Sequence, residues 1–170
     1  YIYEYQTMMC NLTQMPISNA CMYDGSTATA EAVLMASNAS HKNHKVLVSE
    51  TIDPKIMLVV RTYAHFHGVE LETIPAKDGV TPLEVVKEKI AQGGVAGVLV
   101  QQPNFYGIVE DYSGFAEACH ANKALFLMNA NPFDLSILKT PGEWGADVAM
   151  GDGQSLGVPM QWGGPYVGYM

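Results

Sequence analysis

The sequence predicts an α/β fold, in which a mostly parallel sheet carries helices on both of its faces. Three observations predict it. Short apolar segments typical of buried strands alternate along the chain with segments whose apolar residues recur at helical spacing. The stretches between strands are long enough for the helical crossovers that parallel strands require. No internal repeat or low-complexity tract interrupts this alternation over the 170 residues, a length that suits one domain.

The first part of the chain predicts three helices and one strand. Apolar residues stand at helical spacing from the first position, with no capping residue before them. A second helix is expected over 24–38, where small residues lead into an apolar helical face. A short apolar strand follows at 45–49, and Pro54 then opens a helix whose apolar residues share one face.

The next two elements are a half-buried strand and a capped helix. Residues 69–74 alternate between apolar and polar side chains, as a strand with one buried face does. The following helix is expected to begin with Thr81 as its N-cap and Pro82 at its first position. Glu84 stands where the acidic partner of a capping box belongs, so these residues together predict a capping box.

The last part of the chain predicts three further strands and a helix. Residues 95–103 are expected to form a buried strand, followed by a helix over about 110–122 and strands at 124–129 and 146–151. Because ligands of parallel α/β sheets bind at the carboxyl ends of the strands, we expect a binding crevice at that edge. The residues at these strand ends are Ser49, Glu50, 101–104, 128–132 and 150–153.

Composition narrows the classes of function. The net charge is −8 and the nine basic residues form no patch, which argues against a nucleic-acid partner. No apolar run approaches the length needed to span a bilayer and no signal-peptide pattern is seen, so we expect no membrane association. With 48% hydrophobic and only 15% charged residues, the chain is expected to have a face covered by another domain or subunit.

The cysteines and histidines do not predict a metal centre. The three cysteines are widely spaced and form no CxxC pair, so we expect reduced thiols in a cytoplasmic protein. His41 with His44, and His65 with His67, are close enough in sequence to suggest metal ligands. No carboxylate or thiol accompanies either pair, so we expect no metal site.

Two segments could line a ligand site. Residues 24–27 precede or begin a helix, so their backbone N–H groups and hydroxyls point at one spot and form a candidate anion site. Ordinary helix capping by Asp24 or Ser26 explains the same residues. Residues 101–107 leave a strand with amides and two aromatic side chains, which suits either a pocket wall or a well-packed loop.

No reactive group is evident in the expected crevice. The sequence contains neither a Walker pattern nor a GxGxxG motif with a following acidic residue. No Ser/His/Asp or Cys/His grouping converges on the carboxyl ends of the strands. The residues alone therefore predict a ligand-binding α/β domain without an evident nucleophile or general base.

Three separated motifs, in order along the chain, resemble a known family. They are EYQTMMCNLTQMPISNACMYDGSTATAEA (4–32), TPGEWGADVAMGDGQSLGVPM (140–160) and WGGPYVGY (162–169). They are similar to the P-protein of the glycine cleavage system, glycine dehydrogenase (decarboxylating), and within it to the first subunit, the N-terminal half of single-chain forms. Subunits of that family are longer at both ends. We therefore expect residues 1–170 to be a single domain, a fragment of a longer subunit.

The resemblance implies a fold and an activity. The family belongs to the fold-type I pyridoxal phosphate enzymes, whose large domain has a mostly parallel seven-stranded sheet with helices on both faces. It implies a cytoplasmic oxidoreductase of glycine catabolism that decarboxylates glycine and passes the aminomethyl group to the lipoylated H-protein. It also implies a second P-protein subunit as partner, in a heterotetramer built as a dimer of heterodimers, with pyridoxal phosphate bound covalently by that partner.

The same resemblance implies that this chain has no catalytic residue. An ungapped match places Met128 where the partner subunit has the Asp that pairs with the pyridine nitrogen, and Gln154 and Ser155 where it has the His-Lys pair. A methionine cannot hold the pyridinium proton, and a serine cannot form the Schiff base. Lys123 and Lys139 stand at helix-end or loop positions and do not substitute. The chain is thus expected to be the degenerate half of a duplicated pair.

The glycine-rich loop is the remaining candidate for cofactor contact. In related enzymes the matching loop reaches across to the neighbouring subunit. We therefore expect the N–H groups of Gly163 and Gly164 to contact the phosphate of the partner subunit's cofactor, with Pro165 fixing the exit of the loop. A tight turn that leads into the last strand explains the same residues.

Two other functions remain open at this point. The chain could be a non-catalytic scaffold that only docks the catalytic half, with no residue near the cofactor. It could also be an unrelated fold-type I enzyme of the aminotransferase or desulfurase kind. Met128 and Ser155 disfavour that second alternative because they lack the cofactor-binding groups that such an enzyme needs.

Overall fold

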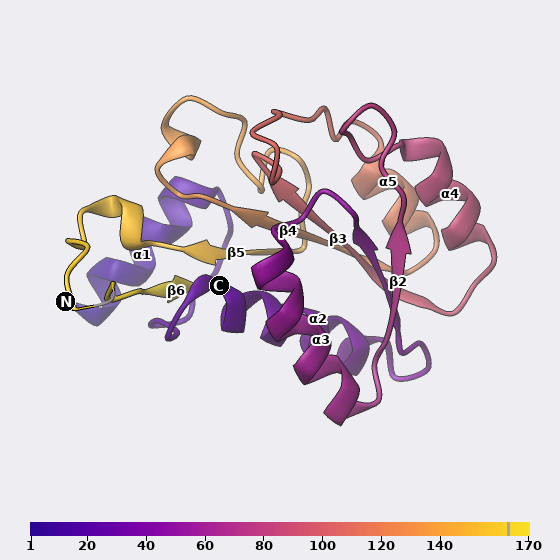
Figure 1. Ribbon diagram of the computed structural model, residues 1–170, viewed down its shortest axis with the longest axis horizontal. Coiled ribbons are helices and arrows are strands. Elements are labelled where there is room, and N and C mark those ends of the chain that lie inside the picture. Colours follow the sequence, from indigo (N-terminus) through magenta and orange to yellow (C-terminus); the bar gives the residue numbers. More distant parts are fainter. Residues whose placement is uncertain (163) are drawn as a thin grey trace.

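A sheet of six strands forms the centre of the protein, in a computed structural model that describes residues 1–162 and 164–170 (Figure 1). The helices are α1 (Ile2–Thr13), α2 (Gly25–Ser40), α3 (Pro54–His67), α4 (Leu83–Ala91) and α5 (Phe115–Ala121), with short 3-10 turns η1 (Asp134–Ser136) and η2 (Gln154–Leu156). The strands are β1 (Lys45–Ser49), β2 (Glu70–Ile74), β3 (Val95–Gln102), β4 (Leu125–Ala130), β5 (Val148–Asp152) and β6 (Gly168–Tyr169).

The strand order is β2-β1-β3-β4-β5-β6, and the first five strands are mutually parallel. Only β6 runs antiparallel to its neighbour β5. The predicted parallel α/β sheet is therefore confirmed. The seventh strand is not confirmed among the described residues, although Met22 forms an isolated antiparallel bridge with Gly168 next to β6.

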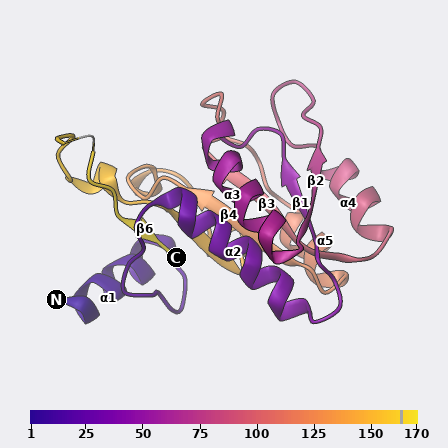
Figure 2. The ribbon, with the colours of Figure 1, turned by 60° about the horizontal axis from the view of Figure 1, so that its bottom comes forward.

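Helices cover both faces of the sheet, as predicted. α2 and α3 pack on one face, where Val33, Val60 and Leu99 belong to one buried apolar cluster. α4 and α5 pack on the other face, around Ile90, Phe115 and further buried side chains (Figure 2). The central strands read as continuous apolar runs because both of their faces are covered.

The edge of the sheet at β6 carries the N-terminal helix. Figure 1 shows α1 beside β6, at the end of the sheet opposite to β2. Met9 of α1 is buried against Ala149 of β5 and Tyr169 of β6. The predicted helical start of the chain is confirmed, with Tyr1 as an N-cap whose side chain makes no capping hydrogen bond.

The helix predicted over 110–122 is shorter than expected and begins only at Phe115. Asp111 accepts a hydrogen bond from the Ser113 N–H at 2.9 Å, a turn that competes with helix formation. Gly114, at the N-cap, has φ of 85°, a left-handed conformation that a helix cannot continue through. Residues 110–114 therefore form a loop in which Tyr112 is buried, and the helical part of the segment is limited to α5.

The predicted capping box at Thr81 is wrong. Helix α4 begins after Pro82, and no side chain caps its N-terminus. Thr81 is instead buried, with its hydroxyl 2.7 Å from that of Ser49. Glu84 accepts a hydrogen bond from Lys87 on the helix surface. A buried hydroxyl network has therefore taken the residue that the local pattern assigned to a cap.

The described part of the chain contains no helix with the length and apolar character needed to cross a bilayer.

Candidate functional site

A cavity of about 540 Å³ lies where the carboxyl ends of β3, β4 and β5 meet the first residues of α2. Parallel α/β sheets bind their ligands at this edge, and the sequence predicted the crevice there. Five amide side chains line the cavity: Gln101, Asn104, Asn129, Asn131 and Gln154. Hydroxyl groups come from Ser26, Ser155 and Tyr166, and carboxylates from Asp134 and Asp152. The end of β1 takes no part, because neither Ser49 nor Glu50 lines the cavity.

The N-terminus of α2 forms one wall of the cavity and carries a capping box. The Asp24 side chain accepts a hydrogen bond from the Thr27 N–H at 2.7 Å, and the Thr27 hydroxyl accepts one from the Asp24 N–H. The two residues therefore form a capping box. The Gly25 N–H donates to Oδ2 of Asp152 at 3.0 Å. Of the two interpretations of residues 24–27, helix capping is therefore the one the structure confirms.

Glycine at position 25 lets the helix approach the end of β5 closely. A Cβ atom added there would lie 2.6 Å from the Asp152 nitrogen and 2.8 Å from the Gly151 carbonyl carbon. Both are backbone atoms, so they have no rotamer by which to move aside. The absence of a side chain at Gly25 therefore allows close packing of α2 against β5.

The amides at the end of β4, Asn129 and Asn131, are held in place by hydroxyl groups. Asn129 donates to the Thr29 hydroxyl of α2 at 2.7 Å, in a buried contact. Ser155 donates to Oδ1 of Asn131 at 2.7 Å. Ser155 therefore lies in the cavity wall, where the resemblance places a Schiff-base lysine, and its hydroxyl is engaged by an amide.

The other residues matched to the partner subunit do not offer reactive groups. Met128 is fully buried in the core on the α4 and α5 side and does not line the cavity. The side chain of Gln154 donates to the Val158 carbonyl at 2.5 Å. Lys139 lies over the Trp144 ring, 3.7 Å from its centroid, and neither it nor Lys123 lines the cavity.

A buried polar network supports the loop after β3, and sequence reasoning missed it. Glu110 is almost fully buried and accepts hydrogen bonds from the Thr51 hydroxyl (2.9 Å), the Asn104 amide (2.7 Å) and the Thr81 N–H (2.6 Å). These donors come from the ends of three different crossovers. Asn104 in turn lines the cavity, so Glu110 fixes one wall of the site.

The loop 101–107 has a divided role. Asn104 and Gly107 line the cavity, whereas the neighbouring rings of Phe105 and Tyr106 project into solvent. Below the loop, the buried Tyr112 hydroxyl donates to the Gln101 carbonyl at 2.8 Å. Burial raises the pKa of Tyr112 well above its ordinary value, so this phenol stays neutral and serves as a structural donor.

The glycine pair is only half described. Gly163 lies outside the described residues. Gly164 adopts a φ of 87°, and its N–H donates to the Gln161 carbonyl at 2.9 Å within a turn. In the chain as it stands, that N–H is therefore engaged within the loop itself.

The histidines make ordinary local contacts. His44 Nδ1 lies 2.9 Å from the Ser37 hydroxyl, and His67 Nδ1 lies 2.9 Å from the Tyr63 carbonyl one turn earlier. Outside position 163, the chain shows no group of three or more His, Cys, Asp or Glu side chains that could hold a metal ion. Burial raises the pKa of the Cys119 thiol to about 12, so this cysteine is not a nucleophile at neutral pH.

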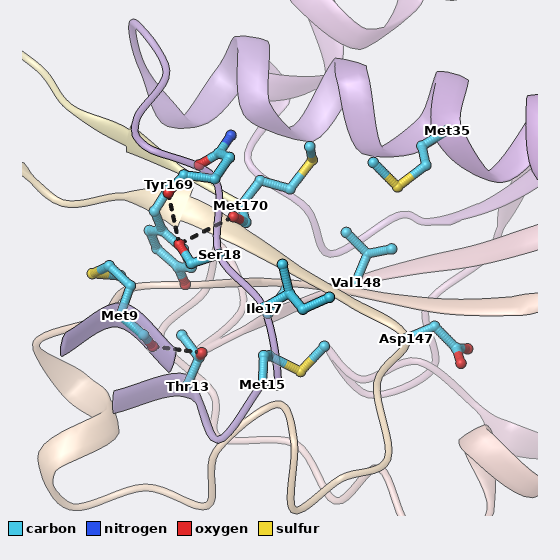
Figure 3. A pocket seen from close by; sticks show the side chains of 12 residues that line it. Met9, Thr13, Met15, Ile17, Ser18, Met35, Asp147, Val148, Tyr169 and Met170 are labelled. Carbon is cyan, nitrogen blue, oxygen red and sulfur yellow. Dashed lines mark hydrogen bonds between the residues drawn. The ribbon is translucent and has the colours of Figure 1, made fainter. Parts of the chain in front are cut away.

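A second cavity, of about 290 Å³, lies between α1, α2 and the β5–β6 edge (Figure 3). Its walls are apolar and rich in methionine, with Met9, Met15, Met35 and Met170 among them. Figure 3 shows the Thr13 hydroxyl turned back onto the Met9 carbonyl, a hydrogen bond of 2.7 Å. With so few polar groups, this cavity offers surface for packing and no set of groups for catalysis.

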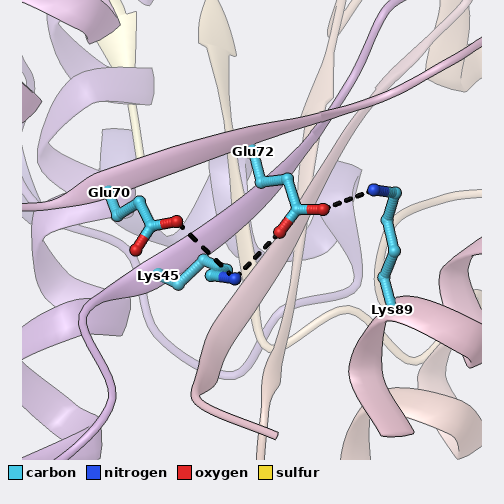
Figure 4. A network of polar contacts seen from close by, with 4 residues as sticks. All are labelled: Lys45, Glu70, Glu72 and Lys89. Carbon is cyan, nitrogen blue, oxygen red and sulfur yellow. Dashed lines mark hydrogen bonds and ion pairs between the residues drawn. The ribbon is translucent and has the colours of Figure 1, made fainter. Parts of the chain in front are cut away.

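The ion pairs at the amino end of β1 are remote from both cavities. Figure 4 shows Lys45 between Glu70 and Glu72, with Lys89 of α4 on the far side of Glu72. Hydrogen bonds from Lys89 and Lys45 hold the pKa of Glu72 below its usual range. β2 is an edge strand, and charged side chains of this kind discourage pairing with another chain. We therefore interpret this ion-pair network as a feature that protects the edge strand β2 from pairing with another chain.

The chemistry available in the main cavity is recognition through amides. Its lining contains two carboxylates and no lysine, arginine or histidine side chain. An amide set of this kind can bind and orient a polar group, but it holds no nucleophile and no cation.

Comparison with known proteins gives a consistent result. A family model described as "Glycine cleavage system P-protein" matches residues 1–170. The chain is 47% identical over 169 residues to a probable glycine dehydrogenase (decarboxylating) subunit 1 of Desulforamulus reducens, covering 99% of this chain and 37% of that protein. A protein of the same name from Syntrophomonas wolfei is 44% identical, with coverages of 99% and 38%. The chain thus spans little more than a third of the length of these relatives.

Solved structures agree with the sequence comparison. The crystal structure of glycine decarboxylase (P-protein) of the glycine cleavage system, in inhibitor-bound form, superposes with a TM-score of 0.90 at 47% identity. It covers 99% of this chain and 37% of that one. The ureidoglycine-glyoxylate aminotransferase of Bacillus subtilis superposes with a TM-score of 0.72 at 19% identity, covering 99% of this chain and 43% of that one, and shares the fold alone. The fold is that of the fold-type I pyridoxal phosphate enzymes.

Proposed function

Because the chain belongs to the P-protein family of the glycine cleavage system, we propose that it acts as part of subunit 1 of glycine dehydrogenase (decarboxylating). Together with a second P-protein subunit it decarboxylates glycine and passes the aminomethyl group to the lipoylated H-protein. The observation that carries this proposal is the identity of 47% over 99% of the chain to a relative named subunit 1. The partner subunit is implied by that name. The H-protein, the substrate glycine and a heterotetramer of two such pairs belong to the proposal.

Pyridoxal phosphate does not fit the cavity of this chain. No lysine lines it, and Ser155 donates its hydroxyl to Asn131 where a Schiff base would have to form. The N-terminus of α2, the natural place for a phosphate, carries the Asp152 carboxylate. We therefore assign the covalently bound cofactor, and the chemical steps that need it, to the partner subunit.

The chain's contribution on this proposal is an interface beside the partner's active site. Large apolar side chains surround the cavity on the loops that follow β3, β4 and β5, and they are at least half exposed. They are Phe105, Tyr106, Val109, Phe133, Ile137, Leu156, Met160, Trp162 and Tyr166. So many exposed apolar groups at one edge are typical of a surface that another protein covers. The partner would exclude water from this edge on docking.

The glycine pair supplies the one contact with the cofactor that we propose for this chain. The N–H groups of Gly163 and Gly164 would reach the phosphate held by the partner subunit, which requires the Gly164 N–H to leave the Gln161 carbonyl on docking. Replacing both glycines with alanine keeps the N–H groups but adds Cβ atoms and disfavours the left-handed backbone of Gly164, so the N–H groups should no longer be held toward the phosphate. Pyridoxal phosphate binding in the complex is expected to weaken about tenfold, the effect of misplacing one or two charge-assisted hydrogen bonds. Cofactor affinity is measured by fluorescence titration of the complex.

A matched variant separates this role from a general loop defect. Gly157 lies in the same loop with a φ of 117° and open space around it, so Gly157→Ala strains the loop without removing the glycine pair. If the double variant binds the cofactor as tightly as the wild-type complex, the glycines form only a turn. Equal weakening in Gly157→Ala would also exclude the specific contact.

Reconstitution tests the proposed activity and distinguishes the alternatives. The partner subunit with this chain, H-protein and pyridoxal phosphate is expected to exchange the carboxyl carbon of glycine with labelled bicarbonate, while either subunit alone is inactive. A partner that is fully active alone would leave this chain as a docking scaffold. Transamination by this chain alone would support an aminotransferase-like enzyme. A cytoplasmic location is part of the same proposal, supported by three cysteines that are all free thiols.

A further inference from the structure

The N-terminus of α2 is an element that commonly binds anions, and here it holds a carboxylate of the same chain. α2 is a helix of 16 residues that begins at the cavity, beside the carboxyl ends of the strands. Helix N-termini at this edge of a parallel sheet commonly hold phosphate groups, because their N–H groups and the helix dipole favour negative charge. Here the position is filled from within the chain. Oδ2 of Asp152 accepts the Gly25 N–H at 3.0 Å.

Asp152 is fixed in that position from two sides. Its other carboxylate oxygen, Oδ1, accepts the Gln154 N–H at 2.9 Å. Its backbone belongs to β5 and pairs with Gly168 of β6. Gly25 lies so close that an added Cβ would be 2.9 Å from the Cβ of Asp152. The carboxylate therefore has little freedom to swing away from the helix terminus.

We propose that Asp152 is a specificity-determining residue that keeps phosphate-bearing ligands out of this cavity. The carboxylate supplies the negative charge that the α2 terminus favours, so an incoming phosphate meets a like charge at the same place. The lining offers no cationic side chain to offset this repulsion at the helix terminus. The lack of a lysine in the lining would prevent covalent attachment of the cofactor, and Asp152 would oppose its non-covalent binding.

The choice of a phosphate-bearing ligand rests on the proposed function, which concerns a pyridoxal phosphate enzyme. The exclusion itself is a property of this chain and needs no partner. It is measured by ligand binding, without glycine turnover. The two can therefore fail separately: an inactive complex leaves the exclusion of phosphate intact, and phosphate binding by the wild-type chain leaves the activity intact.

The test compares Asp152→Ser and Asp152→Asn with a matched control, Asp134→Asn. Serine removes the carboxylate and leaves the α2 terminus open, while asparagine keeps the shape and removes only the charge. Asp134 lines the same cavity from η1, so its variant makes an equal change of charge away from the helix terminus. The full chain is titrated with inorganic phosphate, pyridoxal phosphate and pyridoxal, and binding is followed by equilibrium dialysis and by the shift in melting temperature.

We expect Asp152→Ser to bind phosphate and pyridoxal phosphate at least about tenfold more tightly than the wild-type chain does. Pyridoxal, which lacks the phosphate, is expected to gain nothing. Asp134→Asn is expected to behave as the wild type. Circular dichroism shows whether each variant is folded, and Asp152→Asn decides the matter if the serine variant is not. A folded variant of Asp152 that binds phosphate no better than the wild type overturns the inference, as does equal gain in Asp134→Asn.

Discussion

Glu110→Ala is expected to lower the free energy of unfolding by about 3 kcal/mol or more, because it leaves buried donors without an acceptor. The carboxylate accepts from the Thr51 hydroxyl, the Asn104 amide and the Thr81 N–H, and it is itself only 3% exposed. Each unsatisfied buried donor costs roughly 1–3 kcal/mol. The loss should also loosen the loop after β3, because Asn104 is held by this contact.

Urea denaturation followed by circular dichroism measures the effect. Glu117→Ala is the matched control, since it removes a glutamate from the exposed face of the neighbouring helix α5 and is expected to change stability by less than about 0.5 kcal/mol. Glu110→Gln keeps one acceptor and should fall between the two. A loss for Glu110→Ala as small as that of the control would show that water or other groups satisfy the network.

Gly25→Ala is expected to destabilise the chain by about 2–3 kcal/mol, although alanine is the better helix former. Helix propensity alone would favour the substitution by up to about 1 kcal/mol. The new Cβ would lie 2.6 Å from the Asp152 nitrogen and 2.8 Å from the Gly151 carbonyl carbon, so α2 would have to move away from β5. The steric overlap with the backbone of β5 is expected to outweigh the gain in helix propensity, so the substitution destabilises the chain.

Gly93→Ala provides the comparison for this prediction. Gly93 has a φ of 82° and no atom within 4 Å of an added Cβ, so its substitution costs only the left-handed conformation, about 1 kcal/mol. Thermal and urea unfolding of both variants give the difference. If Gly25→Ala is as stable as the wild type, the helix can shift freely at the cavity and the close packing of α2 on β5 is not a constraint.

The sheet could be predicted from the sequence because its signals are local. β1 and β3 are nearly continuous apolar runs, and both were placed to within a residue or two. The pattern failed where tertiary contacts recruited residues with strong local preferences. Thr81 is a residue type typical of N-caps but lies in a buried hydroxyl network. Residues 110–114 were assigned to the following helix but form a loop with a turn at Asp111.

The position of the site could be predicted from the sequence, but the contacts that hold its residues in place could not. The carboxyl ends of β3, β4 and β5 were correctly expected to line the crevice. The decisive contact between Gly25 and Asp152 joins residues 127 positions apart, and nothing local to either one indicates it. The same holds for Asn129, which is fixed by Thr29 at a separation of 100 positions. Such contacts follow from the strand order and become visible only when the sheet is assembled.

Trapping the cofactor tests the central claim, that this chain is the half without the Schiff-base lysine. The complex of this chain with the second subunit is incubated with stoichiometric pyridoxal phosphate, reduced with borohydride, digested and analysed by mass spectrometry. We expect a pyridoxyl-modified lysine in the partner subunit and none in this chain, with or without the partner. A stoichiometric pyridoxyl-lysine in this chain, at Lys139 or any other position, would contradict the account.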